Sequence, residues 1–449
     1  MTPGSGGSGG TSSTSGTGGP QGATGSGGAH GADRTGGAAG TVDAVGTGGL
    51  PGPADTGGTA GTSGTAGTSG ASRTARTRRA VVVGGSLAGV TAVDELRGQG
   101  WDGPITLVGD EPWAAYARPP LSKGVLKGTE DAGALVLPES GEAEVLTGTR
   151  ATGLDLTARR VRVRNDDGSA DDLPYDALVI ATGARARTLG HPGERTLRTL
   201  DDALRLRAGV TRSRSLLVIG GGFLGMEIAS VAAELGLSVT VVDVRTPLVT
   251  TLGPYLAGLF GRAAYERGVR TVVAPDGVTP APYGAELADG TRLEADLVVT
   301  AVGCRPNTEW LEGSGLTLLG GVVVDERCRA GAPDIVAVGD VAAFPTGDGR
   351  FRRTPHWDSA IGQARAGVAA LLNGDSAPPY TPRPYFWTEA FGLAVKLAGV
   401  LPAAGEPAVL KGSAEARSAL LRWDDPHHPV AAALNHRIPV ARLRALAAA

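Results

Sequence analysis

The chain has 449 residues, a formal net charge of -3 and 41% hydrophobic residues. This length is sufficient for two to four domains, and the nearly balanced charge excludes an overall basic field of the kind that binds nucleic acid. The longest apolar runs are only as long as strands, so we expect no membrane insertion.

Residues 1–77 differ in composition from the rest of the chain. Gly, Ser, Thr and Ala dominate, no aromatic residue occurs, and 26 of the 72 glycines lie in residues 1–70. Such a segment cannot bury enough apolar surface to offset its conformational entropy. We therefore predict a disordered tail, which also lacks the apolar core of a signal peptide.

After the tail, the pattern runs twice through strand, glycine turn, helix and strand. The first unit has predicted strands at Ala80–Val83 and Ile105–Val108 around a helix at Leu87–Leu96. The second has predicted strands at Leu216–Ile219 and Ser238–Val242 around a helix at Gly225–Leu235. Further strands are predicted at Ala177–Ile180, Leu297–Thr300 and Ile335–Val338, and the alternation at Val161–Arg164 indicates a hairpin. Each unit has the size of a βαβ dinucleotide-binding module.

The two turns have the glycine spacing that a pyrophosphate requires. Glycine is needed where a side chain would block the phosphate or the contact between helix and strand, and the helix N-terminus supplies unpaired N–H groups. In the second unit all three positions are glycine, and in the first a small serine takes the middle position. The outer and middle positions are Gly84, Ser86 and Gly89 in the first unit, and Gly220, Gly222 and Gly225 in the second.

Each unit also has an acidic residue at the end of its second strand, where a ribose hydroxyl can donate to it. Asp110 follows Gly84 by 26 residues and Asp243 follows Gly220 by 23, close to the expected spacing of about 20. Asp243 favours NADH over NADPH because a carboxylate repels a 2′-phosphate. Arg245, two residues later, partly offsets that preference.

These observations predict an α/β fold with two Rossmann-like, three-layer dinucleotide-binding domains, one inserted in the other, and a small α+β C-terminal domain. The domains are predicted at 78–191 with 305–378, at 192–304, and at 379–449. The two cysteines, Cys304 and Cys328, fit neither a disulfide framework nor a metal pattern, so we expect no metal and a reduced, cytoplasmic setting.

Several further motifs occur in a characteristic order along the chain. They are Arg118-Pro119-Pro120-Leu121-Ser122-Lys123, Ile180-Ala181-Thr182-Gly183, Val338-Gly339-Asp340, His356-Trp357 and Pro384-Tyr385-Phe386-Trp387. With the two glycine fingerprints, they make residues 79–449 resemble the FAD-dependent pyridine nucleotide reductases. Within these, the chain looks most like the oxygenase-coupled NADH–ferredoxin reductases.

The resemblance implies FAD on the first unit and NADH on the second. FAD pyrophosphate would lie at Gly84–Gly89, Lys123 would approach flavin N5, Glu227 would pair with Lys123, and Trp357 would lie beside the isoalloxazine ring. The implied flavin residues are Gly84, Ser86, Ala88, Gly89, Asp110, Arg118, Lys123, Ala181, Thr182, Gly183, Asp340 and Trp357. The implied NAD residues are Gly220, Gly222, Phe223, Leu224, Gly225, Glu227, Asp243 and Gly303, with Lys123 and Glu227 as the catalytic pair.

Two departures and one absence bear on the electron acceptor. Ala117 and Pro355 stand where the family usually carries acidic residues, near the flavin or acceptor side. Disulfide reductases of this fold need a close cysteine pair ahead of the position of Lys123, and no cysteine precedes Cys304. We therefore expect electrons to leave directly from the flavin.

The resemblance implies a reductase that passes electrons from NADH through FAD to a small acidic ferredoxin serving a P450 or a ring-hydroxylating oxygenase. We expect a monomer or weak homodimer. The same core with rubredoxin, a quinone or oxygen as acceptor is one alternative. A flavoprotein of the apoptosis-inducing type that acts by redox-controlled association is another, and a scaffold with vestigial nucleotide sites is a third.

Overall fold

The computed structural model describes residues 77–138, 141–191, 194–425 and 428–448. The predicted tail, except for Thr77, lies outside these residues. All of the described residues belong to the same structural unit.

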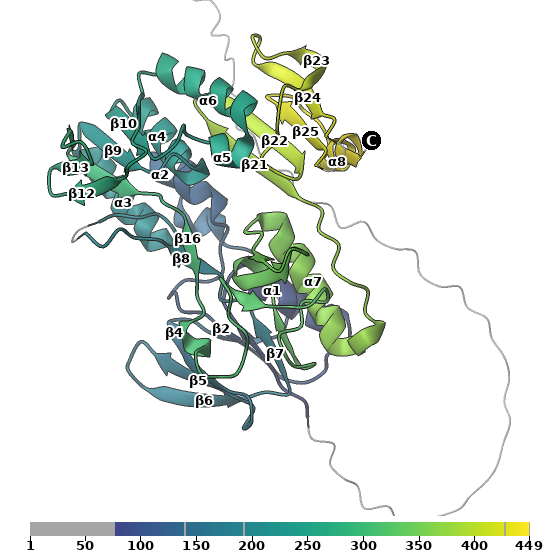
Figure 1. Cartoon of the computed structure of the whole chain (residues 1–449). Coiled ribbons are helices and arrows are strands. Elements are labelled where there is room, and N and C mark those ends of the chain that lie inside the picture. Colours follow the sequence, from purple (N-terminus) through teal and green to yellow (C-terminus); the bar gives the residue numbers. More distant parts are fainter. Residues whose placement is uncertain (1–76, 139–140, 192–193, 426–427, 449) are drawn as a thin grey trace, which may run out of the picture. The chain divides into compact units, whose positions relative to one another are not determined.

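The first parallel sheet has the strand order β18-β7-β1-β2-β3, and Figure 1 labels its strands β2 and β7. Its strands are β1 (Ala80–Val83), β2 (Ile105–Val108), β3 (Glu144–Leu146), β7 (Ala177–Ile180) and β18 (Ile335–Ala337). Helices α1 (Leu87–Gly98) and α7 (Trp357–Asn373) pack together on one face, where Val82 joins their core. On the other face Val81 and Val83 pack against the antiparallel sheet of β4 (Thr149–Asp155), β5 (Arg160–Asn165) and β6 (Ala170–Pro174). Burial on both faces explains why β1 reads as a continuous apolar run.

The second parallel sheet repeats this three-layer arrangement, with the order β11-β10-β9-β15. Its strands are β9 (Ser215–Ile219), β10 (Ser238–Asp243), β11 (Arg270–Val273) and β15 (Leu297–Thr300). Helices α3 (Leu200–Arg212), α4 (Phe223–Glu234) and α6 (Pro254–Glu266) cover one face. The small sheet of β12 (Val278–Ala281), β13 (Gly284–Leu287) and β14 (Arg292–Glu294) covers the other.

Two antiparallel strands connect the two parallel sheets. The chain leaves the first sheet through β8 (Ala184–Ala186) and returns through β16 (Cys304–Pro306), with Cys304 opposite Ala186. This passage explains how the unit with the second parallel sheet is inserted in the unit with the first, and the predicted fold class is confirmed. The domain boundaries at 191/192 and 304/305 fall near this connection and stay predictions.

The C-terminal part forms a five-stranded antiparallel sheet with the order β21-β22-β25-β24-β23. Its elements are β21 (Tyr385–Ala390), β22 (Leu393–Gly399), β23 (Ala408–Ser413), β24 (Ser418–Trp423), β25 (Val430–Leu434) and α8 (Val440–Ala448). Helix α8 packs on the face that holds Ala398, Ala431 and Ala433. The other short α-helices and strands are α2 (Gly124–Lys127), α5 (Val249–Leu252), β17 (Val322–Val323), β19 (Ala342–Pro345) and β20 (Phe351–Arg352). Short 3-10 helices lie at Pro119–Ser122, Ala132–Leu135, Glu309–Leu311, Gly339–Val341 and Gly374–Ser376.

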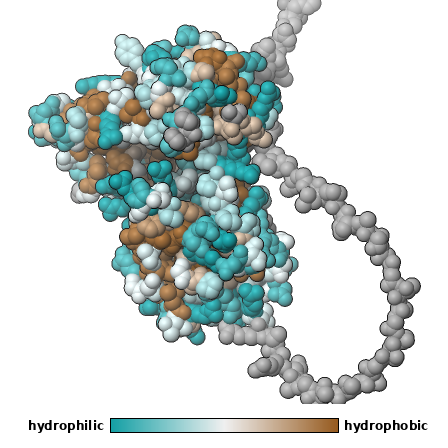
Figure 2. All heavy atoms as spheres, turned by 45° about the vertical axis from the view of Figure 1, so that its right-hand side comes forward, coloured by the Kyte–Doolittle hydropathy of each residue, from teal (hydrophilic) through white to brown (hydrophobic). Residues whose placement is uncertain are grey.

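Helix starts and ends differ most from the predicted bounds. Helix α4 begins at Phe223, two residues before the predicted start, because Gly222 has extended backbone and serves as the N-cap. Helix α1 continues to Gly98, two residues beyond the predicted end. The face shown in Figure 2 interleaves hydrophilic and hydrophobic residues. Among the described residues, no helix is long and apolar enough to cross a bilayer.

Candidate functional site

A cavity of about 910 Å³ lies at the carboxyl ends of β1, β2 and β7. Its lining includes every predicted flavin residue except Gly89, together with Phe223, Leu224 and Glu227 of the predicted NAD set. A volume of this size is typical of a pocket for an organic cofactor. Gly220, Gly222, Gly225, Asp243 and Gly303 are not among the lining residues.

The first glycine turn packs so closely against neighbouring backbone that a side chain at Gly84 or Gly89 would collide with it. Gly84 has a φ of +128°, and a Cβ there would lie 2.1 Å from the carbonyl oxygen of Ala181. A Cβ at Gly89 would lie 1.9 Å from the carbonyl oxygen of Gly84, so Gly89 sits beneath the turn rather than in the cavity wall. Ser86 is the N-cap of α1, and its side chain makes no capping hydrogen bond. The helix N-terminus at the cavity therefore fits the pyrophosphate of a dinucleotide such as FAD.

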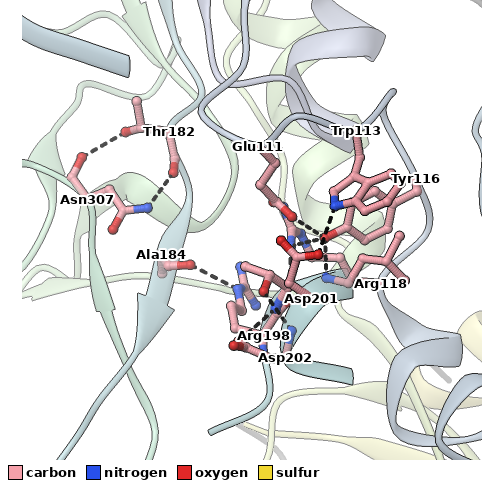
Figure 3. Close-up of polar contacts among 12 residues, drawn as sticks. Glu111, Trp113, Tyr116, Arg118, Thr182, Ala184, Arg198, Asp201, Asp202 and Asn307 are labelled. Carbon is pink, nitrogen blue, oxygen red and sulfur yellow. Dashed lines mark hydrogen bonds and ion pairs between the residues drawn. The ribbon is translucent and has the colours of Figure 1, made fainter. Parts of the chain in front are cut away.

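The turn after β7 is held by Asn307. The Thr182 hydroxyl donates to the backbone oxygen of Asn307 at 2.8 Å, and the Asn307 side-chain amide donates to the backbone oxygen of Thr182 at 2.9 Å (Figure 3). Because Asn307 follows the returning strand β16, this pair of bonds fixes the predicted segment Ala181–Gly183 against the chain that comes back from the second sheet.

Asp110 lines the cavity and pairs with Arg150, a partner that the sequence pattern does not indicate. Its carboxylate accepts a hydrogen bond from the Arg150 Nε at 2.7 Å, and both side chains are largely exposed. The hydrogen bond to Asp110 raises the pKa of Arg150. A ribose at this end of the cavity would meet a carboxylate with its second oxygen still available.

Lys123 and Glu227, 104 residues apart in sequence, form an ion pair in the cavity wall, with 2.7 Å between Nζ and Oε2. Only 7% of Glu227 is exposed. The Ser122 hydroxyl donates to Oε2 at 2.6 Å, and the Thr388 hydroxyl donates to Oε1 at 2.8 Å. This buried carboxylate on α4 thus has partners from the Arg118–Lys123 motif and from β21. Such ion pairing and hydrogen bonding is what a buried charge requires.

Arg118 points to protein groups as well as lining the cavity (Figure 3). Its guanidinium pairs with Glu111 at 2.6 Å and donates to the Tyr116 hydroxyl at 3.0 Å and to the backbone oxygen of Arg198 at 2.9 Å. Burial alone would lower the pKa of Arg118, but Tyr116 and Glu111 raise it overall.

Asp340 lies in a single 3-10 turn, Gly339–Val341, rather than at the start of an α-helix. Its carboxylate pairs with the Arg198 guanidinium at 2.7 Å. The Arg198 Nε also donates to the backbone oxygen of Ala184 at 2.9 Å. Asp340 therefore presents to the cavity a carboxylate that is already neutralised by an arginine.

Aromatic side chains form another part of the cavity wall. Trp357 is the first residue of α7, and His356 is its N-cap. The His356 ring meets the Phe386 ring edge-on at 5.3 Å, and the Phe223 ring lies 4.0 Å from Phe386. Burial lowers the pKa of His356, partly opposed by Asp340. His356 therefore presents a neutral ring at neutral pH.

The second glycine turn has the same close geometry as the first. A Cβ at Gly220 would lie 2.4 Å from the carbonyl oxygen of Ala301, and a Cβ at Gly225 would lie 1.9 Å from that of Gly220. Around Gly222 no heavy atom lies within 4 Å of that position, which leaves open space for a phosphate. Asp243 accepts the backbone N–H of Gly221 at 2.5 Å, so its carboxylate lies against the turn.

Sequence reasoning did not single out Glu111, Tyr116, Arg150 or Arg198. Glu111, Arg150 and Arg198 line the cavity. Tyr116 lies two residues before the Arg118–Lys123 motif, and this position could have drawn attention to the tyrosine. Arg198 has no local pattern to mark it, because its partner Asp340 lies 142 residues further along the chain.

Both cysteines are free thiols. Cys328 is fully buried, and burial raises its pKa, so it is an unreactive thiol. Neither cysteine lines the cavity.

Comparison with known proteins relates this geometry to a family. Residues 78–364 match the family model described as pyridine nucleotide-disulphide oxidoreductase. The chain is 36% identical over 355 residues to the ferredoxin reductase component of chlorobenzene dioxygenase from Cupriavidus sp. (strain PS12), covering 76% of this chain and 85% of the relative. It is also 36% identical over 355 residues to rhodocoxin reductase from Rhodococcus erythropolis, covering 75% and 81%.

Among solved structures, the covalent complex of putidaredoxin reductase with putidaredoxin matches with a TM-score of 0.70 and 30% identity, covering 80% of this chain and 90% of that one. The family model covers more than half of the chain, whose glycine turns, helix N-termini and cavity fit FAD and a pyridine nucleotide. The chain therefore belongs to the pyridine nucleotide-disulphide oxidoreductase family.

Proposed function

We propose that this protein is an FAD-dependent reductase that transfers electrons from NADH to a small acidic ferredoxin, which in turn serves a P450 or a ring-hydroxylating oxygenase. The observation that carries the proposal is the Lys123–Glu227 ion pair, because it joins the cavity at the first glycine turn to the helix that follows the second. The named relatives, which are a ferredoxin reductase component and rhodocoxin reductase, support the same activity.

The two cofactors are assigned to different parts of the chain. The N-terminus of α1 would bind the FAD pyrophosphate, and Asp110 would accept a ribose hydroxyl. The N-terminus of α4 and Asp243 would do the same for NADH, with NADPH disfavoured by the carboxylate of Asp243. When bound, FAD supplies the chemistry by taking a hydride and releasing electrons singly.

Lys123 and Glu227 supply electrostatics at the reacting end of the cavity. The Lys123 ammonium would hold a positive charge where negative charge develops during reduction, and a preorganised charge of this kind stabilises a transition state. Glu227 keeps that ammonium in one place, and the Ser122 and Thr388 hydroxyls keep Glu227 in place. The pair therefore acts through positioning and charge.

The sequence holds no cysteine pair near Lys123, so the protein has no thiol relay there. Electrons pass to an external acceptor: one NADH reduces two one-electron ferredoxins and releases one proton. Residues 379–449 carry eight Lys/Arg against five Asp/Glu, an excess of three positive charges that complements an acidic partner. We place the protein in the cytoplasm as a monomer or weak homodimer.

Stopped-flow spectroscopy tests the acceptor. The protein is reduced with NADH without oxygen and mixed with an acidic [2Fe–2S] ferredoxin, with rubredoxin, with a quinone or with air-saturated buffer. We expect ferredoxin to reoxidise the flavin at least about tenfold faster than air. Reoxidation by ferredoxin no faster than by air would overturn the ferredoxin assignment, and a faster rubredoxin or quinone would identify the alternative acceptor.

A flavoprotein that acts by redox-controlled association would give a different pattern. Turnover would be slow with every acceptor, and light scattering would show dimerisation that depends on NADH. That combination would replace the reductase proposal.

A further inference from the structure

The Tyr116 hydroxyl is a junction between two segments that lie about 80 residues apart in sequence (Figure 3). The residue is buried, with 5% of its surface exposed. Its hydroxyl donates to the Glu111 carboxylate, accepts a hydrogen bond from Arg118 Nη1 at 3.0 Å, and accepts another from the backbone N–H of Leu200 at 2.8 Å. One neutral group thus uses its single proton and both of its lone pairs.

The contact with Leu200 caps a helix. Leu200 is the first residue of α3, and its N–H is one of the groups that has no partner within the helix. The helix's own capping box, Thr199 with Asp202, satisfies the N–H groups of those two residues and leaves that of Leu200 to Tyr116. The Trp113 indole adds a further bond to Asp201 in the same first turn, at 3.2 Å.

The same hydrogen bonds also hold the backbone of Arg198, which precedes Thr199, the N-cap of α3. Arg118 donates to the backbone oxygen of Arg198, while Tyr116 accepts from the amide two residues later. The backbone on both sides of Thr199 is therefore fixed by one loop. From this anchored position the Arg198 side chain extends into the cavity wall and pairs with Asp340 at 2.7 Å.

The charges around the hydroxyl require it to stay neutral. Burial, together with the bond to Glu111, raises the pKa of Tyr116 despite the opposing effect of Arg118. The protonated hydroxyl can therefore donate to the Glu111 carboxylate across the whole physiological range. A phenylalanine at this position would leave Glu111, Arg118 and the Leu200 amide each short of one partner.

We propose that Tyr116 is a positioning residue of the FAD site, which holds Arg198 in register with Asp340 through its bonds to Arg118, Glu111 and the Leu200 amide. This role rests on the proposed function, because it assumes that the cavity holds FAD. Tyr116 itself does not line the cavity, whereas Glu111, Arg118 and Arg198 do. Its proposed effect on FAD passes through Arg198, because the network holds the backbone on both sides of Thr199.

The first test compares Tyr116→Phe with the parent by following the rise in flavin fluorescence as FAD leaves the diluted holoprotein. We expect release to become about tenfold faster, since the bonds lost involve charged groups. Tyr175→Phe is the matched control: Tyr175 is buried at 1% exposure, and it lies outside the cavity lining. Its release rate should stay within about twofold of the parent. Equal release from Tyr116→Phe and the parent would overturn the proposal.

A double-mutant cycle separates positioning from general loosening of the fold. If Tyr116 acts through Arg198, then Tyr116→Phe should accelerate release less than about twofold once Arg198→Gln is present. A full tenfold effect in that background would overturn the proposal. Glu111→Gln is a second variant that breaks the network should Tyr116→Phe fold poorly. Because Glu111 also lines the cavity, its effect on release should shrink in the Arg198→Gln background without vanishing, and an undiminished effect would overturn the proposal.

The proposed function and this inference fail in different ways. A parent protein that carries no flavin and takes up none would overturn the proposed function. A parent that holds FAD, beside a Tyr116→Phe variant that holds it equally well, would overturn the role of Tyr116 alone.

Discussion

Glu227 shows how a buried charge is made tolerable. Its two oxygens have three partners, and those partners come from segments that are far apart in sequence. Removing one partner from a buried carboxylate costs more than removing the whole cluster would, because the remaining charge loses its compensation. The geometry of this cluster is therefore sensitive to single changes.

Lys123→Ala should slow flavin reduction by NADH about tenfold to a hundredfold while leaving most of the FAD bound. This expectation follows from the proposed role of Lys123, since the variant would lose a fixed positive charge beside the reacting atoms. Stopped-flow loss of flavin absorbance measures the rate. Lys127→Ala is the matched control, because Lys127 pairs with Glu234 at the same 2.7 Å on a more exposed surface. A Lys123→Ala rate within about twofold of the parent would remove Lys123 from the reaction.

Asp243→Ala should raise the KM for NADH and narrow its advantage over NADPH, since the repulsion against a 2′-phosphate is lost. Bound FAD should be unaffected, because Asp243 does not line the flavin cavity. Steady-state kinetics with both nucleotides measure this. Unchanged KM values for the two would exclude Asp243 from the nucleotide site.

At the residue scale, the sequence indicated groups that sit in local motifs and missed those that act across the fold. Gly84 and Gly220 were found because glycine spacing is a local signal. Arg198 was missed because its role depends on Asp340, and a long-range ion pair leaves no periodic pattern in the chain.

At the scale of elements, the two strand–turn–helix units owe their shape to backbone contact. The turn brings a helix so close to a strand end that a single methyl group would collide with a carbonyl oxygen. This requirement explains why glycine spacing and apolar runs predicted the strands β1, β2, β7 and β15 at their observed bounds. Helix starts were less predictable, because the N-cap depends on the conformation of one residue.

Gly89→Ala should lower the free energy of unfolding by about 1–3 kcal/mol and release FAD, because the added Cβ meets the Gly84 carbonyl oxygen at 1.9 Å. Gly98→Ala, in the same helix, has open space around the new Cβ and should stabilise the protein by about 0.5–1 kcal/mol. Denaturant unfolding measures both. If the two variants change the free energy of unfolding in the same direction, the close contact at Gly89 does not explain the effect of Gly89→Ala.

Protonation of His356, the residue at the N-cap of α7, should make the stability of the protein depend on pH. His356 has a lowered pKa, so between that value and the ordinary 6.5 the unfolded chain binds a proton that the folded one does not. The free energy of unfolding therefore falls as the pH drops below about 6.5. His356→Asn, which places a residue favoured at N-cap positions before α7, should lose less stability between about pH 7.5 and 5.5 than the parent. Thermal unfolding at both pH values measures the difference, and equal losses would contradict this role.

At the scale of the whole molecule, the cavity wall is assembled from three parts of the fold. The first glycine unit supplies most of it, α4 of the second unit supplies Phe223 and Glu227, and β21 supplies Phe386. The order of motifs along the chain predicted the two nucleotide units and their nesting. It did not predict that the C-terminal sheet supplies Thr388 to Glu227 of the ion pair, because that contact joins residues 161 positions apart.

The visible absorption spectrum of the purified protein, recorded before and after NADH is added without oxygen, tests the central claim most directly. We predict the visible absorption bands of a bound flavin, with the longer-wavelength band bleached by a stoichiometric amount of NADH. A colourless protein that takes up no FAD on reconstitution, or a yellow one whose spectrum NADH leaves unchanged, would contradict it.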